Sequence, residues 1–268
     1  MIRLGQHFLT DKKILQKIAD ALELREGDTV IEIGPGHGEL TQELRSKNQE
    51  LRIIAIEKDK GLAELLQKKF GADKNTKIIS GDALEVLPSL IHDSCFLIRP
   101  CKLAGNLPYY ITGHLLRVLG ELVTLRQAQG ITFTLMVFTI QKEVAERVVA
   151  KPPKMNLLAA SVQIWAEPEI LATIPQSAFN PPPKVGGAII RLRIRNKELG
   201  ITPEKYYKLI KILFKQPRKT ILNNLAEGTN ENKAEVVKKL EKVGIKPTDR
   251  PQNLAIEQLV MLARAFLG

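Results

Sequence analysis

The tetrapeptide Asn106-Leu107-Pro108-Tyr109 carries groups suited to holding an aromatic amine. The amide oxygen of Asn106 and the main-chain carbonyl of Leu107 can both accept hydrogen bonds from an exocyclic NH2, which favours an sp3-like nitrogen. Pro108 lacks an N–H, so acceptors dominate this rim, and the ring of Tyr109 offers a face for stacking a flipped base. We interpret the segment as a place where a base amine is held for group transfer by positioning. An ordinary Asn-x-Pro turn with a packed tyrosine is the alternative.

A second set of residues has the spacing of a nucleotide site. The apolar run 29–33 ends in a turn that contains Gly34 and Gly36, and Glu57 closes the next apolar run, 23 residues beyond Gly34. Glycines let the backbone pass close to a ligand, and an acidic side chain at this place suits two ribose hydroxyls. Asp82 ends a third run, where a carboxylate can accept a hydrogen bond from an adenine amino group. By itself, Asp82 would more often cap a helix.

The turn pattern also indicates which nucleotide. A dinucleotide enzyme would show GxGxxG with a pyrophosphate on the helix N-terminus, whereas this turn reads GxGxG. Glu32 precedes the turn, and a carboxylate there would repel a pyrophosphate but favour a cationic cofactor. We therefore predict S-adenosylmethionine, with a nicotinamide dehydrogenase or a tight turn without a ligand as alternatives.

Hydrophobic periodicity predicts the elements that position these residues. Short apolar runs alternate with helical patterns, which is typical of a largely parallel sheet with helices on both faces. The predicted strands are 29–33, 52–56, 77–80, one ending at 103–105, 133–140 and 188–192; the predicted helices include 12–24, 61–70, 203–214, 233–243 and 256–267. No strand pattern follows residue 196, so we predict an α/β domain over 1–196 and a small all-helical domain over 197–268.

Composition restricts the partners and the compartment. The chain has 268 residues and a formal net charge of +11, which favours a polyanionic partner. The longest apolar stretch, 131–140, is too short to span a membrane, and the first residues show no signal-peptide core. Cys95 and Cys101 give no disulfide framework, and the four histidines show no metal-ligand spacing. We expect a cytoplasmic protein without a metal site.

Basic residues are concentrated in the predicted helical domain. Residues 197–268 hold 14 Lys and Arg against 8 Asp and Glu. Several recur at helical spacing opposite an apolar face and continue into the next turn, which suggests a phosphate-binding surface for RNA. A solvated helix face is the alternative. The candidate RNA-binding residues are Lys205, Lys208, Lys211, Lys215, Arg218 and Lys219.

Over nearly its whole length the chain resembles the KsgA-type ribosomal RNA adenine N6-dimethyltransferases. The resemblance is carried by segments 5–9, 32–38, 81–83, 105–112, 141–145, 179–185 and 218–220. It implies a Rossmann-type class I methyltransferase sheet and the transfer of methyl groups from S-adenosylmethionine to two adjacent adenosines near the 3′ end of small-subunit rRNA, two per base. The implied partner is this rRNA within a pre-ribosomal particle, and we expect a monomer.

The resemblance also implies roles for single residues. Cofactor contacts are implied at His7, Leu9, Gly34, Glu57, Asp82 and Asn106, to which the turn adds Gly36. Tyr109 and Phe179 are implied to flank the target base. Gly186-Gly187 stand where the family usually has Asp-Ser, which could loosen the loop that carries Phe179, and residues 138–140 look inserted between a strand and Gln141.

Two other functions stay open from the sequence. A related resistance-type methyltransferase acts on large-subunit rRNA, although the tetrapeptide and the proline-rich segment after Phe179 resemble the small-subunit enzymes more. The second open function is that of a ribosome-assembly or RNA-binding factor, which would keep the fold without catalytic turnover.

Overall fold

The structure, a computed structural model, describes residues 7–92, 101–127, 133–195 and 200–268. The chain divides into two compact units, Met1–Ala145 with Glu167–Ile194 and Glu146–Ala166 with Arg195–Gly268. The boundary predicted after residue 196 and the side chain of Cys95 lie outside the described residues. Residues 146–166, which the sequence assigned to the first domain, cluster with the C-terminal helices.

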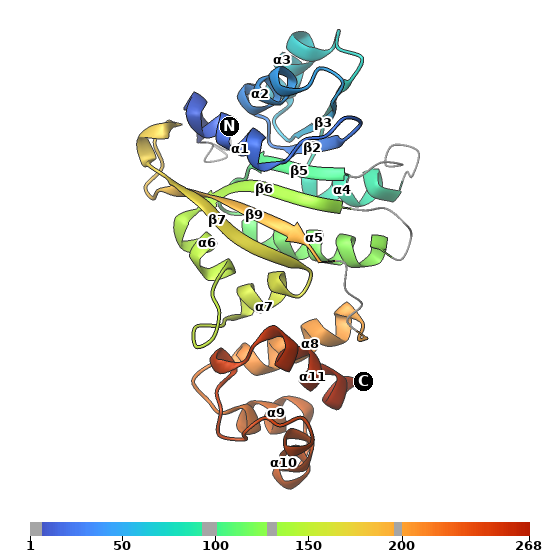
Figure 1. The fold of residues 1–268 in the computed structure, drawn as a ribbon, viewed down its shortest axis with the longest axis vertical. Helices are drawn as coiled ribbons and strands as arrows, with labels where there is room; N and C mark the ends of the chain where they lie inside the picture. Colours follow the sequence, from blue (N-terminus) through green and yellow to red (C-terminus); the bar gives the residue numbers. More distant parts are fainter. Residues whose placement is uncertain (1–6, 93–100, 128–132, 196–199) are drawn as a thin grey trace. The chain divides into compact units, whose positions relative to one another are not determined.

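The first unit is built on a mixed sheet (Figure 1). Its strands are β2 (Thr29–Ile33), β3 (Arg52–Glu57), β4 (Thr76–Ser80), β5 (Cys101–Asn106), β6 (Phe133–Gln141), β7 (Ala166–Ile174) and β9 (Gly187–Ile194). They lie in the order β4-β3-β2-β5-β6-β9-β7. The pairs from β4 to β6 are parallel, and β6 pairs antiparallel with β9. The strands β2 and β3 are buried almost throughout, as expected for parallel strands covered on both faces.

The strand order changes direction at β2, which produces a switch point there. From β2 the chain proceeds to β3 and β4 on one side, and then returns to add β5 on the other side of β2. Ligands of open α/β sheets bind at such a switch point, outside the carboxyl ends of the strands. A Cβ on Gly105 in β5 would lie 2.3 Å from the carbonyl oxygen of Ile33. Only a glycine therefore allows β5 to approach the end of β2 this closely.

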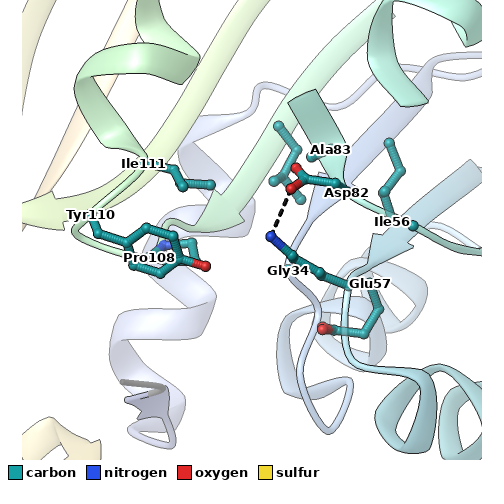
Figure 2. A pocket seen from close by; sticks show the side chains of 11 residues that line it. Gly34, Ile56, Glu57, Asp82, Ala83, Pro108, Tyr110 and Ile111 are labelled. Carbon is teal, nitrogen blue, oxygen red and sulfur yellow. Dashed lines mark hydrogen bonds and ion pairs between the residues drawn. The ribbon is translucent and has the colours of Figure 1, made fainter. Parts of the chain in front are cut away.

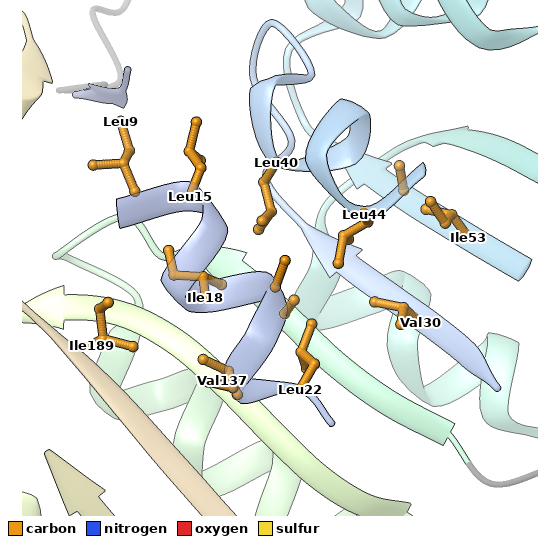
Figure 3. Packing of buried hydrophobic residues seen from close by; sticks show 14 of the residues in the cluster. Leu9, Leu15, Ile18, Leu22, Val30, Leu40, Leu44, Ile53, Val137 and Ile189 are labelled. Atoms are coloured by element: carbon orange, nitrogen blue, oxygen red, sulfur yellow. The ribbon is translucent and has the colours of Figure 1, made fainter. Parts of the chain in front are cut away.

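The helices of the first unit enclose the sheet. They are α1 (Lys12–Ala21), α2 (Glu39–Lys47), α3 (Lys60–Phe70), α4 (Ala83–His92) and α5 (Thr112–Gln127). The boundary between the units falls within α6 (Lys142–Val148). In Figure 3, Ile18 and Leu22 at α1 and Leu44 of α2 lie against Val30 and Val137 of the sheet, and all five side chains are fully buried. Each such aliphatic side chain contributes about 1.5–3 kcal/mol on burial.

Two short strands form a separate sheet beside the switch point. β1 (Phe8–Leu9) pairs antiparallel with β8 (Phe179–Asn180), so that Leu9 lies opposite Phe179. The Nδ1 atom of His7 lies 2.8 Å from the carbonyl oxygen of Pro181 and extends this attachment. The N-terminal segment is thereby fixed to a loop that is 174 positions away in the sequence.

The second unit is helical. It contains α7 (Leu157–Gln163), α8 (Pro203–Lys215), α9 (Ile221–Thr229), α10 (Lys233–Lys242) and α11 (Ile256–Leu267). Helix α8 packs against α7, α9 and α11, and its buried face includes Tyr206, whose hydroxyl donates to the carbonyl of Ala160 at 3.1 Å. Threonine side chains at 202 and 220 cap the N-termini of α8 and α9.

The predicted α/β class with a helical C-terminal part is confirmed. The strand predicted over 133–140 is confirmed, because β6 runs without a break to Gln141, and residues 138–140 are part of it. They pair with β5 on one side and with β9 on the other. Gly186 and Gly187 are closely packed: a Cβ on Gly186 would lie 2.9 Å from the carbonyl oxygen of Ile174, and one on Gly187 would lie 3.1 Å from the ring of Phe179. The expected loosening of the loop that carries Phe179 stays a prediction.

Candidate active site

The glycine-rich turn follows β2 directly at the switch point. Gly34, Gly36 and Gly38 have φ angles of +67°, +61° and +88°, a region that residues with a side chain rarely adopt. A Cβ on Gly36 would lie 2.8 Å from the ring of Phe8. The turn therefore requires glycine both for its backbone conformation and for the close approach of the N-terminal segment.

Glu57 is held rigidly at the end of β3. Its side chain is buried, and its two carboxylate oxygens accept from the backbone N–H groups of Gly36 at 3.1 Å and Asp59 at 2.9 Å. Burial raises the pKa of this carboxyl, although the two N–H groups oppose the shift. Each oxygen keeps a further lone pair, so Glu57 can still accept from the hydroxyl groups of a ligand.

Two hollows adjoin the turn, and Gly34, Glu57 and Pro108 line both. The first hollow is also lined by Ile33, Ile56, Lys58, Gly81, Asp82, Ala83, Tyr110 and Ile111. Figure 2 shows Pro108, Tyr110 and Ile111 on one side of it and Glu57, Asp82 and Ala83 on the other. The second hollow is also lined by His7, Phe8, Gly36, Asn106, Leu107, Tyr109 and Phe179.

Asp82 faces the first hollow and also begins a helix. One carboxylate oxygen accepts from the N–H of Leu84 at 3.0 Å, and the other accepts from Nζ of Lys58 at 2.7 Å, which is the dashed line in Figure 2. Burial would raise the pKa of Asp82, but the ammonium group of Lys58 and the N–H of Leu84 hold it below its usual range. The helix-capping interpretation is therefore correct, and the carboxylate still faces the space in which a ligand would lie.

Asn106 is oriented by the N-terminal segment. Its amide Nδ2 donates to the main-chain oxygen of His7 at 2.7 Å, so Oδ1 is the atom left to accept from a ligand. Leu107 is fixed in turn, because its N–H donates to the carbonyl of Thr139 at 3.0 Å and its side chain is buried. The backbone around the predicted acceptors is thus anchored from two distant segments.

The two predicted stacking residues both line the second hollow. The ring of Tyr109 lies 6.1 Å from that of His7, and its hydroxyl is buried with no partner in the described part of the chain. Burial raises the pKa of Tyr109. Phe179 is 3% exposed and packs over Gly187. A buried hydroxyl without a partner is costly, which suggests that a polar ligand group or a water satisfies it when the site is in use.

Glu32 is buried and hydrogen-bonded within the fold. Its carboxylate accepts from the hydroxyl of Thr41 in α2 at 2.6 Å, and it is 1% exposed. Burial raises its pKa to about 7, with smaller contributions from neighbouring carboxylates. Glu32 is not among the described residues that line either hollow, so it supports the glycine turn from behind and does not face a cofactor.

The candidate RNA-binding residues lie in the second unit. All six are exposed, on α8 and on the turn before α9, whereas Leu209, Ile210 and Leu213 of α8 are fully buried. Lys215 and Lys219 form ion pairs with Glu227. The amphipathic division predicted for this helix is therefore present.

Comparison with known families decides among the classes of enzyme. The chain matches the ribosomal RNA adenine dimethylase family over residues 1–266. It belongs to that family. The dimethylase is therefore an S-adenosylmethionine-dependent methyltransferase, as predicted, and the dehydrogenase alternative is wrong.

Curated relatives of the dimethylase cover nearly all of it. Proteins named ribosomal RNA small subunit methyltransferase A are 38% identical in Dehalococcoides mccartyi, over 98% of this chain and 87% of the relative. The relative in Nostoc punctiforme is 37% identical over 97% of this chain and 92% of its own length. The relative in Halothermothrix orenii is 35% identical over 98% of this chain and 87% of its own length.

Solved structures show the same fold. A dimethyladenosine transferase from Plasmodium falciparum is similar with a TM-score of 0.77 and 23% identity, covering 96% of both chains. The 23S rRNA methyltransferase ErmE is similar with a TM-score of 0.67 and 24% identity, covering 97% of this chain and 99% of the other. The Rossmann-type class I methyltransferase architecture is thereby confirmed.

The residues of the dimethylase fit an S-adenosylmethionine site. Gly34 and Gly36 line the second hollow, Glu57 offers oriented acceptors, and the hydroxyl of Tyr109 has no partner among the described residues. The described residues contain no cluster of three or more potential metal ligands and no helix long and apolar enough to cross a membrane.

Lys58 and Tyr110 are polar residues of the first hollow that sequence reasoning missed. Each directly follows a residue that was singled out, Glu57 and Tyr109. Tyr110 is 60% exposed, which is unusual for so large an aromatic side chain. Adjacency in the sequence was the available signal, but it could not show that these side chains turn toward the hollow.

Proposed function

We propose that this dimethylase transfers methyl groups from S-adenosylmethionine to N6 of two adjacent adenosines near the 3′ end of small-subunit rRNA, two on each base. The observation that carries the proposal is the orientation of Asn106, whose Nδ2 is held by His7 and whose oxygen is left to accept from an amine. The names of the curated relatives, which specify the small subunit, support this choice of substrate.

We assign cofactor binding to residues 1–196. Glu57 is suited to accept from ribose hydroxyls, and Asp82 to accept from an adenine amino group. The backbone at Gly34 and Gly36 and the segment of His7 and Leu9 are assigned to the same site. His7, Gly34 and Gly36 line the second hollow, whereas the side chain of Leu9 is buried and lines neither hollow. S-adenosylmethionine supplies a methyl group that is electrophilic because it is bound to a sulfonium.

The base is held by the second hollow. Asn106 Oδ1 and the carbonyl of Leu107 are the acceptors that orient the amine lone pair, and the proton can leave after transfer without a strong base. Tyr109 and Phe179 provide ring faces for the extruded adenine, and such stacking contributes about 1–3 kcal/mol per base. Positioning of this kind supplies much of the rate.

We assign RNA binding to residues 197–268 through the six basic residues of α8 and the turn that follows it. Their phosphate contacts would provide position and affinity, whereas the second hollow would read the base. We further expect the protein to act as a monomer on a pre-ribosomal particle in the cytoplasm.

The direct test is mass spectrometry of rRNA after incubation with unmethylated small-subunit particles. We expect two methyl groups on each of two adjacent adenosines with the wild type, and a rate lower by roughly 100- to 1000-fold with Asn106→Ala, as for other residues that hold a reacting group. Asn48→Ala is the matched control, since Asn48 lies at the C-terminal end of α2, away from the glycine turn.

The rival functions give different results in the same experiment. Methylation of large-subunit rRNA but not of small-subunit particles would indicate the resistance-type activity. Binding of both cofactor and particles without methylation would indicate an assembly factor. An active Asn106→Ala would remove Asn106 from the mechanism.

A further inference from the structure

A hollow of the second unit lies between α8 and α9. It is lined by Lys211, Ile212 and Lys215 of α8 and by Asn224, Glu227 and Gly228 of α9. A Cβ on Gly228 would lie 2.2 Å from Cγ2 of Ile212. The glycine therefore lets α9 approach α8 closely enough to bring the basic face of α8 beside Glu227.

Glu227 places a carboxylate among these basic groups. Its Oε2 lies 3.2 Å from Nζ of Lys219 and its Oε1 lies 3.5 Å from Nζ of Lys215. Hydrogen bonding and charge from Lys219, followed by charge from Lys215, lower the pKa of Glu227. One anionic group thus bridges two ammonium groups, which is also how a phosphate binds between two lysines.

The packing of α8 and α9 does not depend on this carboxylate. Glu227 is 47% exposed, and exposed ion pairs contribute little to stability. The helices are joined instead by buried Leu225 and by Asn224, whose Nδ2 donates to the carbonyls of Gln216, Lys219 and Thr220. The side chain of Glu227 can therefore move away without disturbing the unit.

We propose that the hollow between α8 and α9 is a seat for one backbone phosphate of RNA. In the free protein Glu227 pairs with Lys215, which lines the hollow, and with Lys219, and it acts as a stand-in for that phosphate. The inference rests on the proposed RNA binding by the second unit. RNA must displace Glu227 from Lys215 and Lys219 to enter the seat. When a phosphate replaces the carboxylate of Glu227, one anion takes the place of another on the same lysines. A polyanion that makes no other contacts therefore gains little binding free energy, so Glu227 weakens non-specific binding.

The test compares Glu227→Gln with Glu241→Gln. The second substitution removes the same charge from an exposed position of α10. We expect Glu227→Gln to bind non-specific RNA about three- to tenfold more tightly than the wild type, because two exposed ion pairs no longer compete. The slope of log affinity against log salt should steepen by about 0.7–0.9, the contribution of one phosphate. Glu241→Gln should change both quantities much less.

A charge-preserving variant separates geometry from net charge. Glu227→Asp keeps the negative charge but shortens the side chain, so that it no longer reaches both lysines. We expect it to bind RNA more tightly than the wild type and less tightly than Glu227→Gln. Thermal unfolding of each variant, expected to match the wild type, checks that the helices still pack.

Two results would overturn the inference. Glu227→Gln and Glu241→Gln could have equal effects, in which case only net charge matters, or Glu227→Gln could weaken binding, in which case Glu227 contacts RNA directly. Lys211→Gln and Lys215→Gln distinguish this failure from a failure of the proposed function. If neither lysine substitution weakens RNA binding, the second unit is not the RNA-binding part; if they do and Glu227 has no effect, only the stand-in role is wrong.

Discussion

The orientation of the Asn106 amide by His7 can be tested by a single isosteric substitution. Nδ2 donates to the oxygen of His7 at 2.7 Å, which leaves Oδ1 as the proposed acceptor for the target amine. Asn106→Asp keeps the size and an acceptor oxygen but replaces the donor by a second oxygen. An ionised carboxylate at this position therefore places oxygen against oxygen at His7.

The cost can be worked out from the contact that is lost. Removing a hydrogen bond and leaving its acceptor unpaired in a part-buried site costs about 2–3 kcal/mol. If the whole cost falls on the reactive orientation, methyl transfer slows by roughly 30- to 150-fold. The charge would also attract a cationic cofactor, so rates must be measured at saturating S-adenosylmethionine.

The variant should recover at low pH. Once protonated, the carboxyl group introduced by Asn106→Asp can donate its O–H to His7, and 2.7 Å is an ordinary O–H···O distance. The carboxylate form is disfavoured beside a carbonyl oxygen, which raises the pKa of the introduced group above that of a free aspartate. The activity of Asn106→Asp relative to the wild type should therefore rise as the pH falls.

The assay is single-turnover transfer of a labelled methyl group between about pH 5 and pH 8, with each rate divided by that of the wild type at the same pH. Asn106→Ala has no group to titrate and should give a flat, low ratio, and Asn48→Asp should give a ratio near one. If the rate of Asn106→Asp relative to the wild type does not change with pH, whether that relative rate is high or low, the proposal that His7 orients the Asn106 amide is refuted.

Two further predictions concern buried charges. Lys102 and Asp28 are 5% and 4% exposed and form an ion pair at 2.6 Å. Lys102→Met leaves the charge of Asp28 buried without its partner, so it should lower the free energy of unfolding, measured in urea, by about 3–5 kcal/mol. Adding Asp28→Leu to this variant should restore most of the lost free energy. Because burial raises the pKa of Glu32 from 4.5 to about 7, the folded state retains a proton that the unfolded state releases, and stability falls as pH rises through this window. Glu32→Gln still accepts from Thr41 but has no proton to release, so it should remove this fall in the free energy of unfolding, which amounts to up to about 3 kcal/mol. The measurement is the free energy of unfolding against pH, and parallel curves for the variant and the wild type would contradict the prediction.

Local patterns were sufficient where a residue type and its place in the chain determine the structure. The run before Gly34 became β2, and Glu57 and Asp82 do end or follow β3 and β4 beside one crevice. Parallel strands carry continuous apolar runs and end at a common edge, so the order of the motifs predicted their proximity.

Elements that depend on distant partners could not be predicted in this way. β7 contains Pro168 and alternates poorly, and it forms because it lies at the end of the sheet, where a missing N–H is tolerated. α9 carries Asn223, Asn224 and Gly228, which are weak helix formers. It is stabilised by packing on α8 and by the cap at Thr220, which no local periodicity reveals.

Distant segments also meet at the tetrapeptide, and the end of β6 takes part in this. The N–H of Leu107 donates to Thr139 in β6, while Asn106 donates to His7 in the N-terminal segment. A strand that stopped at residue 137 would leave Leu107 without this anchor. Because transfer to a weakly nucleophilic amine depends on placement within fractions of an ångström, we expect the anchor at Thr139 to help position the segment that is proposed to hold the base.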